Sequence, residues 1–169
     1  MKFYLYSLLM FLLFSCSKPA PQLPSNKGNT PDTVSGSLLK INEKLTGYED
    51  SIITELVKIR YADFIKSNLG FWYKTENSST KSLIKEYDKC TVYYSLSTLN
   101  GKKLIQEKTT ITIGQKEIIA GIEECLKLMS KGDKATVIIP WYLAYGLNGK
   151  DSEIEPYTSL IAELIVLEE

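Results

Sequence analysis

The sequence of 169 residues contains no histidine. A Ser–His or Cys–His nucleophile pair, an imidazole base and a histidine metal ligand are therefore all excluded. Its 3 cysteines are too few for a four-cysteine zinc site or for a disulfide framework. These absences remove most hydrolase and metalloenzyme classes, and we expect no metal site.

The sequence also lacks an excess of either charge, because its 20 basic side chains balance 20 acidic ones. Proteins that bind nucleic acid usually carry a basic surface, so we expect no nucleic-acid partner. With 44% hydrophobic and 24% charged residues, the chain is too apolar to be disordered. Its length suits one globular domain with accessory segments.

An apolar run of about a dozen residues follows Lys2, which is the length of a signal-peptide core and too short to span a bilayer. The run ends in the letters LFSC, which resemble a bacterial lipobox with Cys16 as its last residue. We therefore expect residues 1–15 to be a signal peptide and Cys16 to carry lipid. The alternative is an ordinary secretory signal that happens to contain a cysteine.

The next segments predict a tether and then a helix. Residues 17–37 contain four prolines and two glycines, so we expect residues 16–37 to be an extended tether. Over residues 38–69, apolar residues recur at helical spacing, which predicts a helical segment. We place its main helix at about 50–67 and expect Gly47 to interrupt the helix before it.

The second half of the chain predicts strands around a single helix. The helix is Gln115–Met129, which is apolar on one face. The predicted strands are Gly70–Thr75, Cys90–Ser97, Thr109–Ile113, Lys134–Pro140 and Leu160–Leu167. Strands grouped around one embedded helix predict an α+β fold with an antiparallel sheet. Cys90 and Cys125 fall on a predicted strand and helix, where we expect buried thiols.

Three motifs stand in a distinctive order after residue 100: Gly114-x-x-x-Ile118-Ile119-x-Gly121, Met129-x-x-Gly132, and Ile139-Pro140 followed by Leu143-Ala144-Tyr145-Gly146. With these gaps, residues 70–169 resemble the FKBP-type peptidyl-prolyl isomerases. The lipobox, the upstream helix and the letters YADFIKSNLGFWYK most resemble the gliding-motility-associated FKBP-type lipoproteins of Bacteroidetes. The resemblance implies a twisted antiparallel sheet wrapped around one central helix, a domain at 70–169 that folds by itself, and no cofactor.

The resemblance also implies a cleft between the start of the helix, the concave face of the sheet and the loop after Tyr145. Seven residues fall on its pocket positions: Tyr94, Leu104, Ile118, Ile119, Ile122, Tyr145 and Ile154. Taken alone, the isoleucines would be core residues in most proteins, whereas a tyrosine in a loop is a better functional candidate.

Several of these positions depart from the family pattern. Leu104, Thr109 and Ala162 replace aromatic residues, and Ile122 replaces a tryptophan. Ile105 stands where active members usually carry an aspartate. Because the pocket positions are apolar and none is cationic, we expect large apolar residues before proline to be preferred over glutamate.

These observations favour a prolyl isomerase with proline-containing polypeptides as substrates. The resemblance implies that the Ile119 N–H and the Tyr145 hydroxyl donate hydrogen bonds to the substrate carbonyls that flank the isomerising bond. The alternative is a non-catalytic FKBP-like binding module in envelope or gliding machinery, which the pocket substitutions favour; a third is a purely structural lipoprotein. We expect lipid anchoring at the periplasmic face of the outer membrane and a dimer through the helix at 50–67.

Overall fold

The structure is a computed structural model that describes residues 32–76 and 82–168. The expected signal peptide, the expected lipid attachment at Cys16 and residues 16–31 of the expected tether lie outside the described residues. Among the described helices, none combines the length and the apolar character that a membrane crossing requires.

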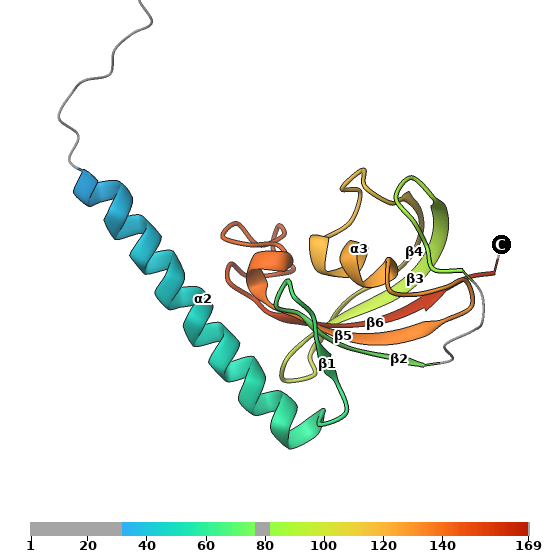
Figure 1. Cartoon of the computed structure of the whole chain (residues 1–169), viewed down its shortest axis with the longest axis horizontal. Coiled ribbons are helices and arrows are strands. Elements are labelled where there is room, and N and C mark those ends of the chain that lie inside the picture. The colour runs from blue at the N-terminus through green and yellow to red at the C-terminus, as the bar shows by residue number, and fades with distance from the viewer. Residues whose placement is uncertain (1–31, 77–81, 169) are drawn as a thin grey trace, which may run out of the picture. The chain divides into compact units, whose positions relative to one another are not determined.

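Six antiparallel strands form one sheet in the order β1-β2-β5-β6-β3-β4, shown in Figure 1. They are β1 (Ile65–Lys66), β2 (Trp72–Glu76), β3 (Lys89–Thr98), β4 (Lys103–Thr112), β5 (Lys134–Ile139) and β6 (Leu160–Val166). The five predicted strands are confirmed as β2 to β6, but β4 starts at Lys103 instead of Thr109 and β1 was not predicted. The predicted inward side chains of β3 are buried: Cys90, Val92, Tyr94 and Leu96. The predicted α+β fold is confirmed.

The central helix, α3 (Ala120–Leu126), is shorter than the predicted Gln115–Met129. It begins later because Lys116 has a φ of 56°, which lies in the left-handed region and cannot belong to a right-handed helix. The predicted apolar face is confirmed, since Ile122, Cys125 and Leu126 are fully buried. Helix α3 packs against β5 on one face of the sheet (Figure 1).

The upstream helix, α2 (Asp32–Arg60), corrects two predictions. It begins inside the expected tether and continues through Gly47, because one glycine in a helix costs only about 1 kcal/mol. The Ser51 hydroxyl donates to the Gly47 carbonyl at 2.9 Å, so Ser51 lies within the helix rather than at its start. The helix ends at Arg60 instead of residue 67, and the chain turns into β1.

Hydrophobic clusters cover both faces of the sheet within residues 40–169, which form one compact unit. The main cluster lies between the sheet and α3. A second cluster joins Ile53 and Val57 of α2 to Ile138 and Ile161, which pair across β5 and β6. Ile53 is fully buried there. The helix therefore contributes to the core, and independent folding of residues 70–169 stays a prediction.

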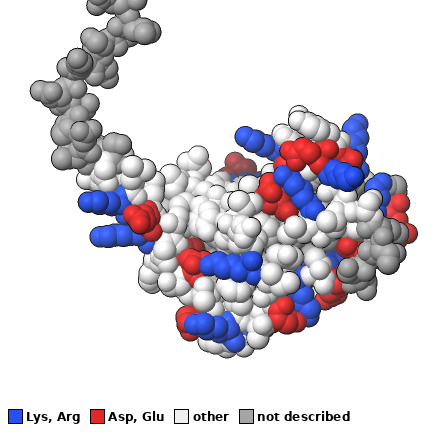
Figure 2. Space-filling model, in the orientation of Figure 1, with Lys and Arg blue, Asp and Glu red and all other residues white. Residues whose placement is uncertain are grey.

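The distribution of charge on the surface and the burial of two cysteines match what the sequence predicts. On the face shown in Figure 2, basic and acidic side chains are interspersed over the described residues instead of forming a field of one sign. Cys90 and Cys125 are free and buried, which confirms the expected thiols. Burial raises the pKa of the Cys125 thiol to about 12, so it stays protonated and unreactive at neutral pH.

Candidate functional site

A hollow of about 410 Å³ lies where β3, β4, the turn before α3 and the loop after residue 143 meet. Its lining consists of Tyr94, Glu107, Thr109, Lys116, Glu117, Ile118, Ile119, Tyr145 and Lys150. We call this hollow the cleft. It brings together four of the seven residues predicted from the sequence: Tyr94, Ile118, Ile119 and Tyr145.

The other three predicted residues do not line the cleft. Ile122 is 0% exposed and Ile154 is 2% exposed, so both are core residues beneath it. Leu104 lines a different hollow of about 680 Å³, together with Tyr93 on the other side of β3. Leu96 and Ile105, which are partners across β3 and β4, line the same second hollow.

Tyr94 is held by a carboxylate that the sequence pattern did not reveal. Its hydroxyl donates to Glu107 Oε2 at 2.7 Å, and the two residues are direct partners across β3 and β4. Burial, reinforced by this hydrogen bond, raises the pKa of Tyr94 and keeps the hydroxyl protonated. A carboxylate therefore contacts Tyr94 although position 105 is an isoleucine.

Tyr145 lies on an ordered loop that follows the short helix η2 (Trp141–Leu143). The Gly146 N–H donates to the Trp141 carbonyl at 3.0 Å, which closes the turn around Tyr145. Burial raises the pKa of the Tyr145 hydroxyl, and two nearby carboxylates add to the rise. The loop also requires Gly149, since its φ is 67° and a Cβ there would lie 2.2 Å from the Ile154 carbonyl oxygen.

Two hydrogen-bond donors of the cleft have no acceptor in the described part of the chain. They are the backbone N–H of Ile119, just before the first residue of α3, and the hydroxyl of Tyr145. Both lie beside the apolar side chain of Ile118. Both donors are partly exposed, so they are available to a molecule that enters the cleft.

A buried hydrogen-bond chain connects α2 to the loop that carries Tyr145. The Ser159 hydroxyl donates to Glu49 Oε1 of α2 and accepts a hydrogen bond from the Trp141 N–H at 2.8 Å. Ser159 is 6% exposed. Glu49 therefore supports the loop, although it lies far upstream of it in the sequence.

Two lysines also line the cleft, which the sequence pattern did not reveal. Lys116 comes from the turn before α3, and the Lys150 Nζ lies 5.7 Å from the centre of the Tyr145 ring. The expectation that the pocket contains no cation is therefore wrong. Lys116 and Lys150 belong to separate loops, and only the folded structure shows that both loops border the same hollow.

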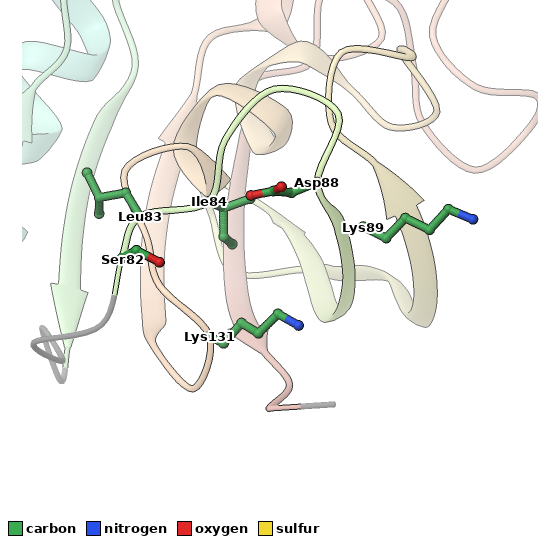
Figure 3. A pocket seen from close by; sticks show the side chains of 6 residues that line it. All are labelled: Ser82, Leu83, Ile84, Asp88, Lys89 and Lys131. Atoms are coloured by element: carbon green, nitrogen blue, oxygen red, sulfur yellow. The ribbon is translucent and has the colours of Figure 1, made fainter.

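Another hollow, of about 490 Å³, lies next to the segment that leads into β3 (Figure 3). It is lined by Ser82, Leu83, Ile84, Asp88, Lys89 and Lys131. The Asp88 carboxylate accepts the Lys85 N–H at 2.8 Å, and Figure 3 shows Lys89 extending away from the other side chains. This hollow shares no residue with the cleft, and its side chains do not converge on one point.

Comparison with known proteins identifies the class. The family model of the FKBP-type peptidyl-prolyl cis-trans isomerases matches residues 80–166, which is more than half of the chain. The chain therefore belongs to this family of enzymes, as the resemblance in its sequence implied. The matched residues include the whole cleft, whereas α2 lies outside them.

Individual relatives agree with this class. The chain is 29% identical over 134 residues to the macrophage infectivity potentiator of Trypanosoma cruzi, covering 76% of this chain and 68% of that protein. It is 30% identical over 102 residues to a probable FKBP-type peptidyl-prolyl cis-trans isomerase of Haemophilus influenzae, covering 59% of this chain but only 42% of that protein.

A crystal structure supports the fold. The peptidyl-prolyl cis-trans isomerase of Pseudomonas syringae pv. tomato has a TM-score of 0.63 and 20% sequence identity with this chain. The match covers 74% of this chain and 92% of that chain, so the likeness includes more than the family segment.

Proposed function

We propose that this chain catalyses cis–trans isomerisation of X–Pro bonds in polypeptides, and that the cleft is its active site. The observation that carries the proposal is the pair of free donors, the Ile119 N–H and the Tyr145 hydroxyl, beside the apolar Ile118. Family membership supplies the class of reaction, and the geometry of the cleft is consistent with it.

The reaction requires little more than these groups. Rotation about the X–Pro bond must overcome amide resonance, with a barrier of about 18–20 kcal/mol for a peptide bond. Catalysis needs the twisted amide to be bound more tightly than either planar form, and no covalent step or proton transfer is required. The donors orient the flanking carbonyls, while the apolar wall stabilises the twisted amide, which has less charge separation than the planar one.

The competing hypothesis is a non-catalytic binding module, which the aliphatic pocket substitutions and Ile105 favour. Glu107 weakens that argument, because it places a carboxylate on the Tyr94 hydroxyl from two residues further along β4. The test is NMR exchange spectroscopy on blocked X–Pro tetrapeptides with the full chain. We expect measurable acceleration that falls about tenfold in Tyr145→Phe.

The matched control is Tyr157→Phe, which removes a hydroxyl from a tyrosine that packs on Trp141 but does not line the cleft. It should retain full activity. A chain that accelerates no X–Pro peptide, or that responds equally to both substitutions, contradicts the proposed active site.

We also propose that the chain is a lipoprotein of the bacterial outer membrane, facing the periplasm, of the gliding-motility-associated type. The support is the LFSC sequence that ends in Cys16, and the lack of an acidic cluster after it. Cys16→Ala should release the protein from the membrane fraction and abolish incorporation of labelled fatty acid, whereas Ser17→Ala should change neither. Membrane retention with label in the Cys16→Ala chain contradicts this assignment.

A dimer through α2 is proposed from its exposed apolar stripe rather than from residues 50–67. The stripe consists of Ile41, Leu45, Tyr48, Ile52 and Ile59, which are 37–78% exposed. Their spacing of three, four and seven residues is the heptad pattern of helices that pack on another helix. At 3.6 residues per turn, the centre of the stripe lies roughly a third of a turn from the buried Ile53 and Val57.

Sedimentation of the full chain should therefore report a dimer. Replacing Leu45 and Ile52 with glutamate should shift it to the monomer, because two charges then lie in an apolar seam. The control is Lys44→Glu, which lies outside the stripe and should leave the dimer intact. A wild-type chain that sediments as a monomer at every concentration excludes this dimer.

A further inference from the structure

The two lysines of the cleft approach it from different segments of the chain. Lys116 belongs to the turn that precedes α3, and Lys150 belongs to the loop that follows Tyr145. Both line the same hollow as the two donors proposed to hold the client backbone. A bound chain therefore comes within reach of two ammonium groups.

The carboxylates of the cleft already accept hydrogen bonds from the protein. Glu107 accepts one from the Tyr94 hydroxyl at 2.7 Å, and Glu117 accepts one from the Thr112 N–H at 3.0 Å. The two lysines form fewer or weaker polar contacts than these carboxylates. Lys116 forms no ion pair within the described residues, and Lys150 Nζ lies 3.9 Å from Glu153 Oε2, which is a weak contact.

The main chain is constrained at both lysines. Lys116 has a φ of 56°, a conformation that residues other than glycine seldom adopt and that is often found at functional sites. The Lys150 N–H donates to the Ile154 carbonyl at 2.8 Å, and the Ile154 N–H donates back to Lys150 at 3.1 Å. The side chain of Lys150 is 35% exposed, so most of its surface contacts the protein.

We propose that Lys116 and Lys150 make the cleft selective for clients with an acidic residue directly before the proline. This inference rests on the proposed isomerase function. The Tyr145 hydroxyl is the donor for a carbonyl that flanks the isomerising bond, and Lys150 lies over the Tyr145 ring. The side chain next to that carbonyl is thus within reach of Lys150, and Lys116 lines the same hollow from the turn before α3.

The proposal reverses the preference expected from the sequence, which favoured large apolar residues before proline. A carboxylate that reaches either ammonium group gains a charge-assisted hydrogen bond, whereas a leucine gains only contact with Ile118 and Ile119. Since both lysines are at least partly exposed, the selectivity should be moderate and should decrease with salt.

The experiment compares blocked tetrapeptides Ala-Xaa-Pro-Phe, with Xaa as Glu, Gln, Leu or Lys, by NMR exchange on the full chain. We expect kcat/KM for the Glu peptide to exceed that for the Gln peptide at least about fivefold in low salt. The ratio should fall towards one in Lys116→Gln/Lys150→Gln and in high salt. The control Lys89→Gln, in the other hollow, should keep the wild-type ratio.

A wild-type Glu-to-Gln ratio of one or less, or a ratio unchanged in the double variant, overturns the selectivity. Chemical-shift titration with the same peptides separates this result from failure of the isomerase function. One result would separate the two proposals: no peptide is isomerised, but the Glu peptide still binds at least about fivefold more tightly than the Gln peptide. In that case the proposed selectivity of Lys116 and Lys150 is kept, and the proposed isomerase function is wrong. Equal binding of the two peptides without isomerisation overturns both.

Discussion

The Tyr94 hydroxyl donates a 2.7 Å hydrogen bond to the Glu107 carboxylate, directly across β3 and β4 at the floor of the cleft. The contact couples the edge strand β4 to the strand beside it and keeps Tyr94 in one orientation. It also explains how a chain with Ile105 at the expected acidic position retains a carboxylate in the cleft.

Glu107→Ala should leave the hydroxyl of the buried Tyr94 without its acceptor. We expect a loss of about 1–3 kcal/mol in the free energy of unfolding, measured with urea, and a clear fall in isomerase rate. The control is Glu163→Ala, because Glu163 accepts a comparable cross-strand hydrogen bond from Ser95 away from the cleft. If both variants lose the same isomerase activity, the role of Glu107 in the cleft is wrong.

Ser159→Ala should weaken the support of the loop that carries Tyr145. The substitution leaves the Trp141 N–H without its acceptor, so we expect a cost of about 1–3 kcal/mol. Amide exchange at Gly146 should become faster, and the isomerase rate should decrease. Ser51→Ala removes an exposed hydroxyl that bonds within α2 and should alter neither quantity.

Ile53→Ala tests whether α2 belongs to the folded core. Ile53 is 0% exposed, so we expect a loss of about 2–5 kcal/mol in the free energy of unfolding. Ile59→Ala, at a position that is 78% exposed, should cost little when both are measured below the dimerisation range. A fragment starting at residue 70 should likewise be less stable than the full chain, because Ile138 and Ile161 lose their cover.

The isomerase rate should be nearly constant between pH 6 and 9, since the chain contains no histidine. At higher pH the folded state should lose stability. The pKa values of Tyr94 and Tyr145 are raised in the folded chain, so the unfolded chain releases these protons first as the pH passes about 10.

Urea denaturation from pH 7 to pH 11 measures this loss of stability. Tyr145→Phe should make the decrease above pH 10 shallower than in the wild type, because one group with a raised pKa is removed. Tyr157→Phe serves as the comparison, since it removes a tyrosine that does not line the cleft. A stability that rises between pH 10 and 11 contradicts the prediction.

Local patterns were sufficient for the elements whose side chains alternate or repeat regularly. The period of two in β3 and the apolar face around Ile122 predicted the buried residues correctly. Backbone conformation was harder to predict. The residues around Lys116 give no indication of its positive φ. Gly47 was expected to interrupt a helix that in fact continues through it. Tertiary packing against the sheet stabilises a helix that propensity alone would interrupt.

Only part of the lining of the cleft could be predicted from the sequence. Tyr94, Ile118, Ile119 and Tyr145 belong to motifs that are recognisable in one dimension. Glu107 depends on the pairing register of β3 with β4, and a register cannot be read from either strand alone. The meeting of Lys116 with Lys150, and of Glu49 with Ser159, requires the complete fold.

The position of β4 at the edge of the sheet also affects the solubility of the chain. In the described part of the chain, its 10 residues pair only with β3, so one side of its backbone is open to solvent. An open edge of this length can template addition of a strand from another molecule, and charged side chains along it oppose that addition. Lys103, Glu107 and Lys108 provide such charges. The carboxylate that holds Tyr94 therefore also protects the sheet from aggregation, and an apolar residue at position 107 would favour intermolecular β-sheet.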